Sequence, residues 1–465
     1  MKHKIWLIVI LGIHILAGCT LPFADNNLSS SEGEGDTLGL IPYFTYEVVE
    51  QTPNILVNQT GYLPENRKMA VLQGNLLENV FYVYNAATDE VAYEGILKSD
   101  TLEMEDAAEE EMQNDSPVKN IYPADFSEVT EPGTYYLYHS DLGYSYSFEI
   151  RNDIYDKIEK DTLSLIEEET TDTSLICYQL AGLLLAKELY PENILEQQRL
   201  EQLCQEKIEL LLQAQDSVTG NVYADVFDVK RMQESDETKK QQYISLAATA
   251  EFAGTLAIYA YQIQDTDRNL FYQIQTAAER AYRTIQNSLD NVGYDAGYFA
   301  AANLYRLTGK LKYSQAIGQY LAMKEEQKSY TEYDFSLFGD YAYLTLRQGS
   351  NLEWSELIMK KIMKNAEQIA FSVGKNSYYI SEKREYNDIN GILRDMSNMA
   401  LVNYIITNHE YSMLQKNYLD YLLGRNSYNI CFMDGFGIRN AVESEKKINA
   451  FNGGLFYLLL QSTKI

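Results

Sequence analysis

Two patterns of apolar residues divide the chain, and one gives way to the other near residue 152. Before that point, short β-branched or aromatic runs are separated by Gly, Pro, Asn and Asp, which is typical of strands joined by turns. The runs cover 55–58, 69–72, 81–84, 134–138 and 145–150. Strands at this spacing predict a small β-sandwich. The acidic stretch from Glu103 to Asp115 interrupts it and is either a solvated loop or a cation site.

After residue 152 the apolar residues recur at helical spacing, first on a face formed by Leu200, Leu203, Cys204, Ile208 and Leu211. All eight prolines lie at or before Pro191, so the chain after that residue contains none. Long helices need this absence of proline, because a proline inside a helix costs about 3 kcal/mol. The Ala-rich stretch 243–263 is apolar on several sides and predicts an inner helix. We expect further helices at 267–288, 295–307, 310–324, 335–348, 353–370, 391–407, 409–423 and 452–462. This succession predicts a solenoid, a toroid or a bundle, and no fixed-period repeat selects the solenoid.

The N-terminal residues have the organisation of an export signal. A basic head with Lys2 and Lys4 precedes an apolar run over 5–15, and Leu16-Ala17-Gly18-Cys19 follows. The run is too short to cross roughly 30 Å of hydrocarbon, so a secretory signal is favoured over a spanning helix. Leu-Ala-Gly-Cys resembles the bacterial lipobox, which implies cleavage before Cys19 and two acyl chains on its thiol. The alternative is an ordinary signal peptide that happens to contain a cysteine.

This resemblance implies a signal peptide over 1–18 and a lipidated tether over 19–52. The tether is rich in Ser, Gly, Asn and acidic residues without an apolar period, and we expect it to be flexible. The expected localisation is extracytoplasmic, with a lipid anchor in the bacterial cell membrane, because two acyl chains give stable anchoring.

Composition limits the classes of binding partner and of catalytic chemistry that are open to the protein. The formal net charge of −29 repels phosphate backbones, so nucleic acid is excluded and neutral or cationic partners are favoured. Apart from Cys19, the cysteines are Cys177, Cys204 and Cys431, an odd set that argues against a disulfide framework, although one pair could form. Beyond the signal only His139 and His409 remain, too few for a His-rich zinc site or a Ser-His-Asp triad. We expect no metal and no cofactor, since no ligand cluster or nucleotide fingerprint occurs.

The strand region is similar to a known domain. It carries Ile55-Leu56-Val57-Asn58-Gln59-Thr60-Gly61-Tyr62-Leu63-Pro64, then Ala124-Asp125-Phe126-Ser127, Pro132-Gly133-Thr134-Tyr135-Tyr136 and Ser145-Tyr146-Ser147-Phe148-Glu149-Ile150. These segments resemble the immunoglobulin-like domain that precedes the catalytic domain of glycoside hydrolase family 9 cellulases.

The helical part continues this resemblance in the same order. The matching segments are Leu211-Leu212-Gln213-Ala214-Gln215-Asp216, 247–253, 301–309, and Asp420-Tyr421-Leu422-Leu423-Gly424-Arg425-Asn426 followed by Gly435-Phe436-Gly437. The resemblance implies a multidomain protein, with an all-β immunoglobulin-like sandwich over 53–151 and an all-α (α/α)6 toroid over 152–465. It also implies a family of mostly inverting endo- or exo-glucanases.

The catalytic base of the family has no counterpart in its usual place. Inverting hydrolysis needs two carboxyl groups about 6.5–9.5 Å apart, one to activate water and one to protonate the leaving oxygen. The family takes its base from an Asp-Ala-Gly-Asp loop after the first helix, but residues 161–180 leave no room for one. Asp295-Ala296-Gly297 is followed by Tyr298, and we interpret it as the start of a helix.

The acid and the sugar-binding segment also depart from the family. After Gly437 the family has His-His-Arg, whereas this chain has Ile438-Arg439-Asn440. Aligning the last helix on Asn452 puts Lys446 at the position of the acid, with Glu445 one residue away and Glu443 nearby. Glu445 and Glu443 are therefore the candidate catalytic residues, and a solvated run of charges is the alternative. The candidate substrate-binding residues around this signature are Tyr428, Asp434, Phe436 and Arg439.

Two functions from different classes follow, and whether the protein is an enzyme stays open. The first is a surface-anchored lipoprotein that binds or processes a polysaccharide, a β-glucan or another cell-envelope glycan, without the usual Asp/Glu dyad. The chain has thirty-nine tyrosines, and aromatic rings can stack on sugars or simply pack in a core. Both roles are possible for the pairs Tyr341/Tyr343, Tyr378/Tyr379 and Tyr418/Tyr421.

The second function is an active glycosidase that hydrolyses O-glycosyl bonds through a relocated carboxylate pair. Its acids would come from Asp225, Asp228, Asp334, Asp340, Glu443 and Glu445. A structural role beside an export or polysaccharide-synthesis complex is a third possibility, and protein partners are unknown.

Overall fold

The computed structural model describes residues 52–97, 120–226, 243–288, 291–381, 388–442 and 446–464. Cys19 with the tether, the acidic stretch 103–115, Asp228, Glu443 and Glu445 lie outside the described residues. The chain from Thr52 onward forms one compact unit. Among the helices that are described, none has a segment both long enough and apolar enough to cross a membrane.

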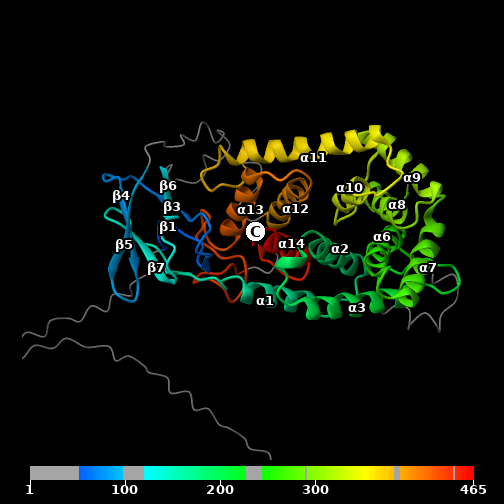
Figure 1. Cartoon of the computed structure of the whole chain (residues 1–465), viewed down its shortest axis with the longest axis horizontal. Coiled ribbons are helices and arrows are strands. Elements are labelled where there is room, and N and C mark those ends of the chain that lie inside the picture. Colours follow the sequence, from blue (N-terminus) through cyan, green and yellow to red (C-terminus); the bar gives the residue numbers. More distant parts are fainter. Residues whose placement is uncertain are drawn as a thin grey trace, which may run out of the picture. The chain divides into compact units, whose positions relative to one another are not determined.

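The N-terminal part of this unit is a sandwich of two sheets (Figure 1). One sheet has the order β1 (Ile55–Leu56), β3 (Met69–Gln73), β6 (Ile121–Asp125). The other has the order β2 (Gly61–Tyr62), β9 (Phe148–Ile150), β7 (Gly133–His139), β4 (Val80–Asn85), β5 (Glu90–Ile96), and β8 (Gly143–Tyr144) pairs with β7. Strand pairs are antiparallel except β2 with β9. Alternation along β4 buries Phe81 and Val83 between the sheets, as the strand period requires.

The helical part is a closed double ring of helices (Figure 1). The inner helices are α2 (Thr173–Leu189), α6 (Leu246–Ile263), α8 (Tyr294–Thr308), α10 (Ser336–Leu344), α12 (Ile389–Ile405) and α14 (Gly453–Thr463). Each contacts the next, and α14 returns to α2. The outer helices are α1 (Asp156–Glu167), α3 (Gln197–Gln213), α7 (Arg268–Ile285), α9 (Leu311–Ala322), α11 (Leu352–Val373) and α13 (His409–Leu422). This is the predicted (α/α)6 toroid behind a β-sandwich.

Burial explains which helices lie inside. Residues 248–260 of α6 are buried on every side, because its Ala, Gly and Thr side chains let neighbouring helices approach closely. The outer helix α7 buries one face only, which carries Ile274, Ala277, Ala278, Ala281, Tyr282 and Ile285. Asp267 begins α7 by accepting hydrogen bonds from the amides of Asn269 and Leu270 at 3.1 and 3.0 Å. Cys177, Cys204 and Cys431 are buried free thiols.

The ring closes where its first and last inner helices meet backbone to backbone. A Cβ atom on Gly182 of α2 would lie 2.6 Å from the carbonyl of Gly454 in α14. A Cβ atom on Gly454 would lie 2.7 Å from the carbonyl oxygen of Gln179. The Gln179 amide also donates a 2.7 Å hydrogen bond to the carbonyl of Ala450, ahead of α14. Only glycine fits at either side of this contact.

One glutamine joins the sandwich to the toroid. The amide nitrogen of the Gln59 side chain donates to the backbone and side-chain oxygens of Asn429 at 2.8 and 3.0 Å. The side-chain oxygen accepts from the backbone amides of Ile438 and Arg439 at 2.9 and 3.1 Å. Gly437 has a φ of 67°, and a Cβ there would come within 2.9 Å of the same oxygen. The signature that resembles family 9 therefore wraps around a residue of the sandwich.

We predict that Gly182→Ala destabilises the protein by about 2–3 kcal/mol, because the new methyl group has no space against the Gly454 backbone. Urea unfolding followed by circular dichroism measures the loss. Gly374→Ala is the matched control, since Gly374 has a φ of −61° and a Cβ there would lie at an ordinary 3.5 Å from its nearest neighbour. Equal stability of the two variants would contradict the backbone contact between α2 and α14.

Candidate functional site

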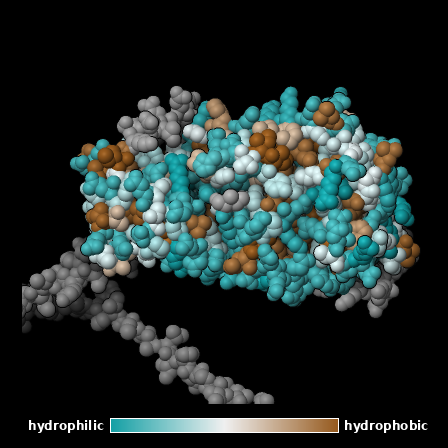
Figure 2. Space-filling model, in the orientation of Figure 1, coloured by the Kyte–Doolittle hydropathy of each residue, from teal (hydrophilic) through white to brown (hydrophobic). Residues whose placement is uncertain are grey.

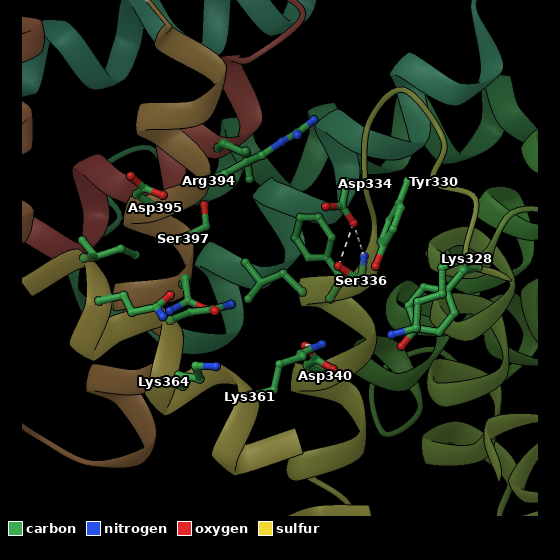
Figure 3. Close-up of a pocket in the computed structure, with 18 of the residues that line it drawn as sticks. Lys328, Tyr330, Asp334, Ser336, Asp340, Lys361, Lys364, Arg394, Asp395 and Ser397 are labelled. Atoms are coloured by element: carbon green, nitrogen blue, oxygen red, sulfur yellow. Dashed lines mark hydrogen bonds and ion pairs between the residues drawn. The ribbon is translucent and has the colours of Figure 1, made fainter. Parts of the chain in front are cut away.

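A cavity of about 980 Å³ lies among α10, α11 and α12 (Figure 3). The segment 325–334, which leads into α10, forms another wall. Tyr178 of α2, Tyr294 of α8 and Leu455 of α14 complete the lining. The cavity is thus built from several hairpins of the toroid together with one loop.

Polar residues line the two long walls at helical spacing. On α11 they are Lys361, Lys364, Asn365 and Gln368, while Ile358, Ile362 and Ala366 on the neighbouring stripe are buried. On α12 they are Arg394, Asp395, Ser397 and Asn398. Residues three or four apart share a face of a helix, so each wall presents one polar stripe to the cavity.

Two cations on these walls have no carboxylate partner among the described residues. Arg394 is exposed although it belongs to an inner helix. It donates a 3.2 Å hydrogen bond to the Glu332 carbonyl, and its charge opposes the burial that raises the pKa of the Tyr178 hydroxyl to about 12. Lys364 is exposed on α11. Both side chains are available to a bound molecule.

Two acids among the candidates for a relocated pair, Asp334 and Asp340, line this cavity. Asp340 is buried, accepts a 3.1 Å hydrogen bond from the Tyr298 hydroxyl and forms an ion pair with Lys361. Burial raises the pKa of the Asp340 carboxyl, and Lys361 opposes this shift. Asp334 has a φ of 51°, which is unusual outside glycine. Its carboxylate accepts from the Ser336 amide at 3.2 Å and from the Ser336 hydroxyl at 2.6 Å.

An exposed aromatic ring stands at the cavity. Tyr330 is 47% exposed, and its hydroxyl donates a 3.0 Å hydrogen bond to Glu325. Its ring packs edge-on against Tyr294, with ring centroids 5.6 Å apart. The Lys328 ammonium lies 4.4 Å from the Tyr294 centroid on another side. Tyr330 therefore offers a fixed, half-open aromatic surface, a feature that suits the apolar face of a sugar ring.

The connection between α1 and α2, where the resemblance places the family's base loop, is short. It consists of five residues, 168–172. The last of them, Asp172, caps α2 by accepting a 2.9 Å hydrogen bond from the Leu175 amide. Thr171 donates a 2.6 Å hydrogen bond to Asp225, which fixes that candidate acid beside the same connection. No Asp-Ala-Gly-Asp loop stands between these helices.

Asp295 has a structural role at the start of α8. Its buried carboxylate accepts from the amide and hydroxyl of Thr331 at 2.8 and 2.5 Å. It also accepts from the Phe335 amide at 3.0 Å. Asp295 thus holds the segment that forms one wall of the cavity, in agreement with its interpretation as the start of a helix.

Aromatic rings pack at the N-terminal ends of the inner helices, beside the cavity. Tyr178 lies 5.1 Å from Tyr333 and 5.5 Å from Phe335, centroid to centroid. Tyr333 stacks on Phe451 at 5.0 Å. These rings occupy space between α2, the segment before α10 and the segment before α14.

The four predicted substrate-binding residues do not line this cavity. Tyr428 is exposed and its carbonyl accepts a 3.2 Å hydrogen bond from Arg439, which also donates to Thr52 at 2.8 Å. Phe436 is buried, with the Lys157 ammonium 4.3 Å from its centroid. Asp434 pairs with Lys447 at 2.8 Å. The structure places all four in the loop before α14, where Gln59 organises the backbone, and their binding role stays a prediction.

The paired tyrosines proposed for stacking on sugars are packing residues. Tyr341, Tyr343, Tyr418 and Tyr421 are each at most 4% exposed, so their rings cannot meet a ligand. Tyr378 and Tyr379 pack against Leu56, Val71 and Ile121 of the sandwich. For the four buried rings the stacking hypothesis is wrong.

The sequence did not predict the cations of the cavity walls or the exposed ring of Tyr330 as parts of a site. One signal was present, because Lys361, Lys364, Asn365 and Gln368 recur with the helical period on one side of a single helix. The same spacing on an exposed outer helix usually marks a solvated face, so the pattern alone did not indicate a site.

Near the cavity, a buried acid lies on α6. Glu251 is 1% exposed, and its Oε2 has no hydrogen-bond partner among the described residues. Burial raises the pKa of Glu251 to about 8; the hydroxyls of Ser174 and Thr331 lower it in part, and the Asp295 charge adds to the rise. We therefore expect Glu251 to be neutral in the folded protein at neutral pH.

The comparisons with known proteins agree with this architecture. Residues 50–143 match the cellulase N-terminal ig-like domain, and residues 174–448 match glycosyl hydrolase family 9. A sandwich followed by a toroid of this kind defines the class of immunoglobulin-domain cellulase folds. The chain belongs to glycosyl hydrolase family 9. A search of the curated proteins found no match.

Solved structures share the fold at low sequence identity. A metagenome-derived family 9 endoglucanase has a TM-score of 0.71 and 17% identity, covering 88% of this chain and 99% of that chain. A family 9 protein from Bacteroides ovatus has a TM-score of 0.67 and 16% identity, covering 88% and 98%. An endoglucanase from Alicyclobacillus acidocaldarius has a TM-score of 0.65 and 18% identity, covering 83% and 85%.

We predict that Glu251→Gln stabilises the protein above neutral pH. The folded pKa of Glu251 is about 8 against an ordinary 4.5. The unfolded chain therefore ionises first, and this residue's contribution to stability is lost as the pH rises from about 4.5 through 8. The unfolding free energy of the variant, relative to wild type, should rise by on the order of 3 kcal/mol between pH 5 and 8.5.

Unfolding in urea at a series of pH values measures this difference. Glu356→Gln, at an exposed position of α11, is the control and should follow the wild-type profile. Parallel profiles for Glu251→Gln and wild type would show that Glu251 is ionised in the folded state.

Proposed function

We propose that the protein is an exported lipoprotein whose family 9 scaffold binds or processes a polysaccharide without the family's usual catalytic dyad. Its lipid on Cys19 would hold it to the outer face of the bacterial cell membrane. A β-glucan is the first candidate ligand, because solved structures with this fold include endoglucanases. The five-residue connection between α1 and α2 carries the proposal.

The short connection bears on catalysis because water activation needs a positioned base. If the general base and the general acid are absent from their usual positions, the contribution of each proton transfer to the rate, about 10²–10⁴-fold, is lost. In the place of the base loop stands Asp172, whose Oδ1 is engaged in capping α2. The scaffold does not depend on this loop, because the apolar faces of the helices hold the ring together.

The cavity supports sugar binding by its composition. Its walls carry amides and hydroxyls, which donate and accept hydrogen bonds as sugar hydroxyls require. They come from Asn365, Gln368, Ser397 and Asn398, and the ring of Tyr330 faces the same space. Arg394 and Lys364 add two cations, each able to bind a hydroxyl or a carboxylate.

A second candidate function is hydrolysis through Asp334 and Asp340, which line the same cavity. A buried carboxyl with a raised pKa suits a general acid, and Asp340 has one. Asp334 is half-buried and has a left-handed backbone conformation, and it would act as the base. Strained residues of this kind cluster at functional sites.

We predict that the purified protein releases no sugar from a panel of neutral β-glucans, because the described connection between α1 and α2 holds no base loop. Reducing-sugar release over several hours measures this, with an established endoglucanase as the positive control. Release that Asp340→Asn and Asp334→Asn both abolish would establish the second candidate function. Release that only Glu445→Gln abolishes would place the acid in the loop before α14.

We predict that the cell-associated protein carries a lipid on Cys19. Metabolic labelling with radioactive palmitate should mark the wild-type protein, and Cys19→Ala should lose the label because the acylated thiol is gone. Cys177→Ala, at a buried thiol, is the control and should keep the label. Label that survives Cys19→Ala would rule out the anchor.

A further inference from the structure

The outer face of the larger sheet of the sandwich carries an array of tyrosines. Alternation along β4 turns Phe81 and Val83 inward, and along β7 it turns Tyr135 and Leu137 inward. The residues between them face the other side of the sheet. On that side lie Tyr82 and Tyr84 of β4, Tyr136 and Tyr138 of β7, and Tyr144 of β8, which we call the tyrosine face.

The rings of the tyrosine face form one connected surface. Tyr84 stacks on Tyr136 with centroids 5.4 Å apart and planes 8° from parallel, and it meets Tyr138 edge-on at 6.2 Å. Tyr144 lies 5.5 Å from Tyr136 and 4.9 Å from Tyr138. Tyr82 extends the array along β4, 6.3 Å from Tyr84. Strand spacing makes this surface roughly 10 Å wide across β4, β7 and β8.

These rings remain accessible in the folded sandwich. Tyr144 is 61% exposed, and the other four are half-buried by one another. The hydroxyls of Tyr82, Tyr84, Tyr138 and Tyr144 form no hydrogen bond with any described residue. Tyr136 is the exception, because its hydroxyl donates a 2.5 Å hydrogen bond to Asp89 in the turn between β4 and β5. The central ring is thus fixed while the surrounding hydroxyls stay available.

Cross-strand aromatic pairs stabilise a sheet by themselves. Stabilisation alone does not require an exposed array, because the inner face already supplies Phe81, Tyr135 and Phe148 to the core. Exposed apolar residues also border the array on β5, where Val91 is 49% and Ile96 is 70% exposed. Figure 2 shows apolar side chains gathered at this end of the sandwich.

We infer that the tyrosine face is a second carbohydrate-binding surface, which takes an uncharged polysaccharide chain. The C–H faces of pyranose rings pack on aromatic rings, and the free phenol hydroxyls can bond to sugar hydroxyls. This surface lies on the sandwich and does not rest on the function proposed for the cavity.

The charges around the tyrosine face disfavour a polyanionic ligand. Glu94 is exposed and stands opposite Tyr82 in the β4–β5 register. Asp89 holds Tyr136, and Glu149 of β9 lies on the same sheet, paired with Arg151 at 3.3 Å. A polyanion meets repulsion from these carboxylates, and so do the acidic segments of this chain. A neutral glycan meets none.

Affinity electrophoresis of the whole protein tests the inference. The gels contain either a soluble neutral mixed-linkage β-glucan or carboxymethyl-cellulose, a polyanion. We expect the neutral glucan to retard the wild type and the polyanion to do so less. The double variant Tyr84→Ala/Tyr144→Ala removes the neighbours on both sides of Tyr136 and Tyr138, and we expect its affinity for the neutral glucan to fall about tenfold or more.

Two controls keep the outcome specific. Tyr84→Phe/Tyr144→Phe preserves the rings and should keep most of the affinity. Tyr272→Ala removes a comparably exposed ring, 63% exposed on α7, and should change nothing. Circular dichroism confirms that each variant is folded.

Tyr330→Ala separates this surface from the cavity. Loss of retardation in Tyr330→Ala with none in the double alanine variant overturns the inference and leaves the cavity as the binding site. Retardation of the wild type by neither polymer overturns it as well, as does equal retardation of the wild type and the double alanine variant. Loss of retardation in the double alanine variant, with the Phe double variant and Tyr272→Ala still retarded, supports the tyrosine face, whether or not Tyr330→Ala also weakens retardation through the cavity.

Discussion

The helical architecture rests on a contact between two glycines. Gly182 and Gly454 bring the first and last inner helices together without side chains between them. This close approach lets the inner helices form a ring in which every neighbour is in contact. The cavity lies among α10, α11 and α12, and Tyr178 of α2 and Leu455 of α14 reach its lining from the two helices that close the ring.

A short connection between α1 and α2 is compatible with the complete fold for a physical reason. The ring is held by apolar faces that extend along every helix, so shortening a single connection removes no core contact. Catalytic groups, in contrast, depend on a few side chains placed on loops. Asp172 and Asp295 illustrate the difference. Both are acids at the start of inner helices, and both are engaged in local hydrogen bonds.

Much of the fold followed from periodicity. The helices α7, α8, α9, α12 and α13 begin and end within a few residues of the predicted ranges, because their apolar stripes are long and bounded by capping residues. The strand β5 escaped prediction, since Glu90, Glu94 and Gly95 interrupt its apolar pattern at the edge of the sheet. The two-residue strands β2 and β8 give no pattern at all.

The candidate site was less predictable. The sequence named Asp334 and Asp340, but it could not bring them beside Lys361 and Arg394, which come from other helices. Tyrosine was equally ambiguous, because a ring with a hydroxyl suits both a core and a surface. Tyr343 is buried in the toroid while Tyr144 is exposed on the sandwich, and no local pattern separates them.

The junction at Gln59 has a mechanical consequence. A pull on the chain from its N-terminal side enters the folded unit at Thr52, which Arg439 holds through a 2.8 Å hydrogen bond. A few residues further on, β1 pairs with β3 and Gln59 bonds to the loop before α14. Load is thereby divided between the smaller sheet and the loop before α14 before it reaches α11 and α12, the long walls of the cavity. A protein tethered at this end would bear tension first through this junction.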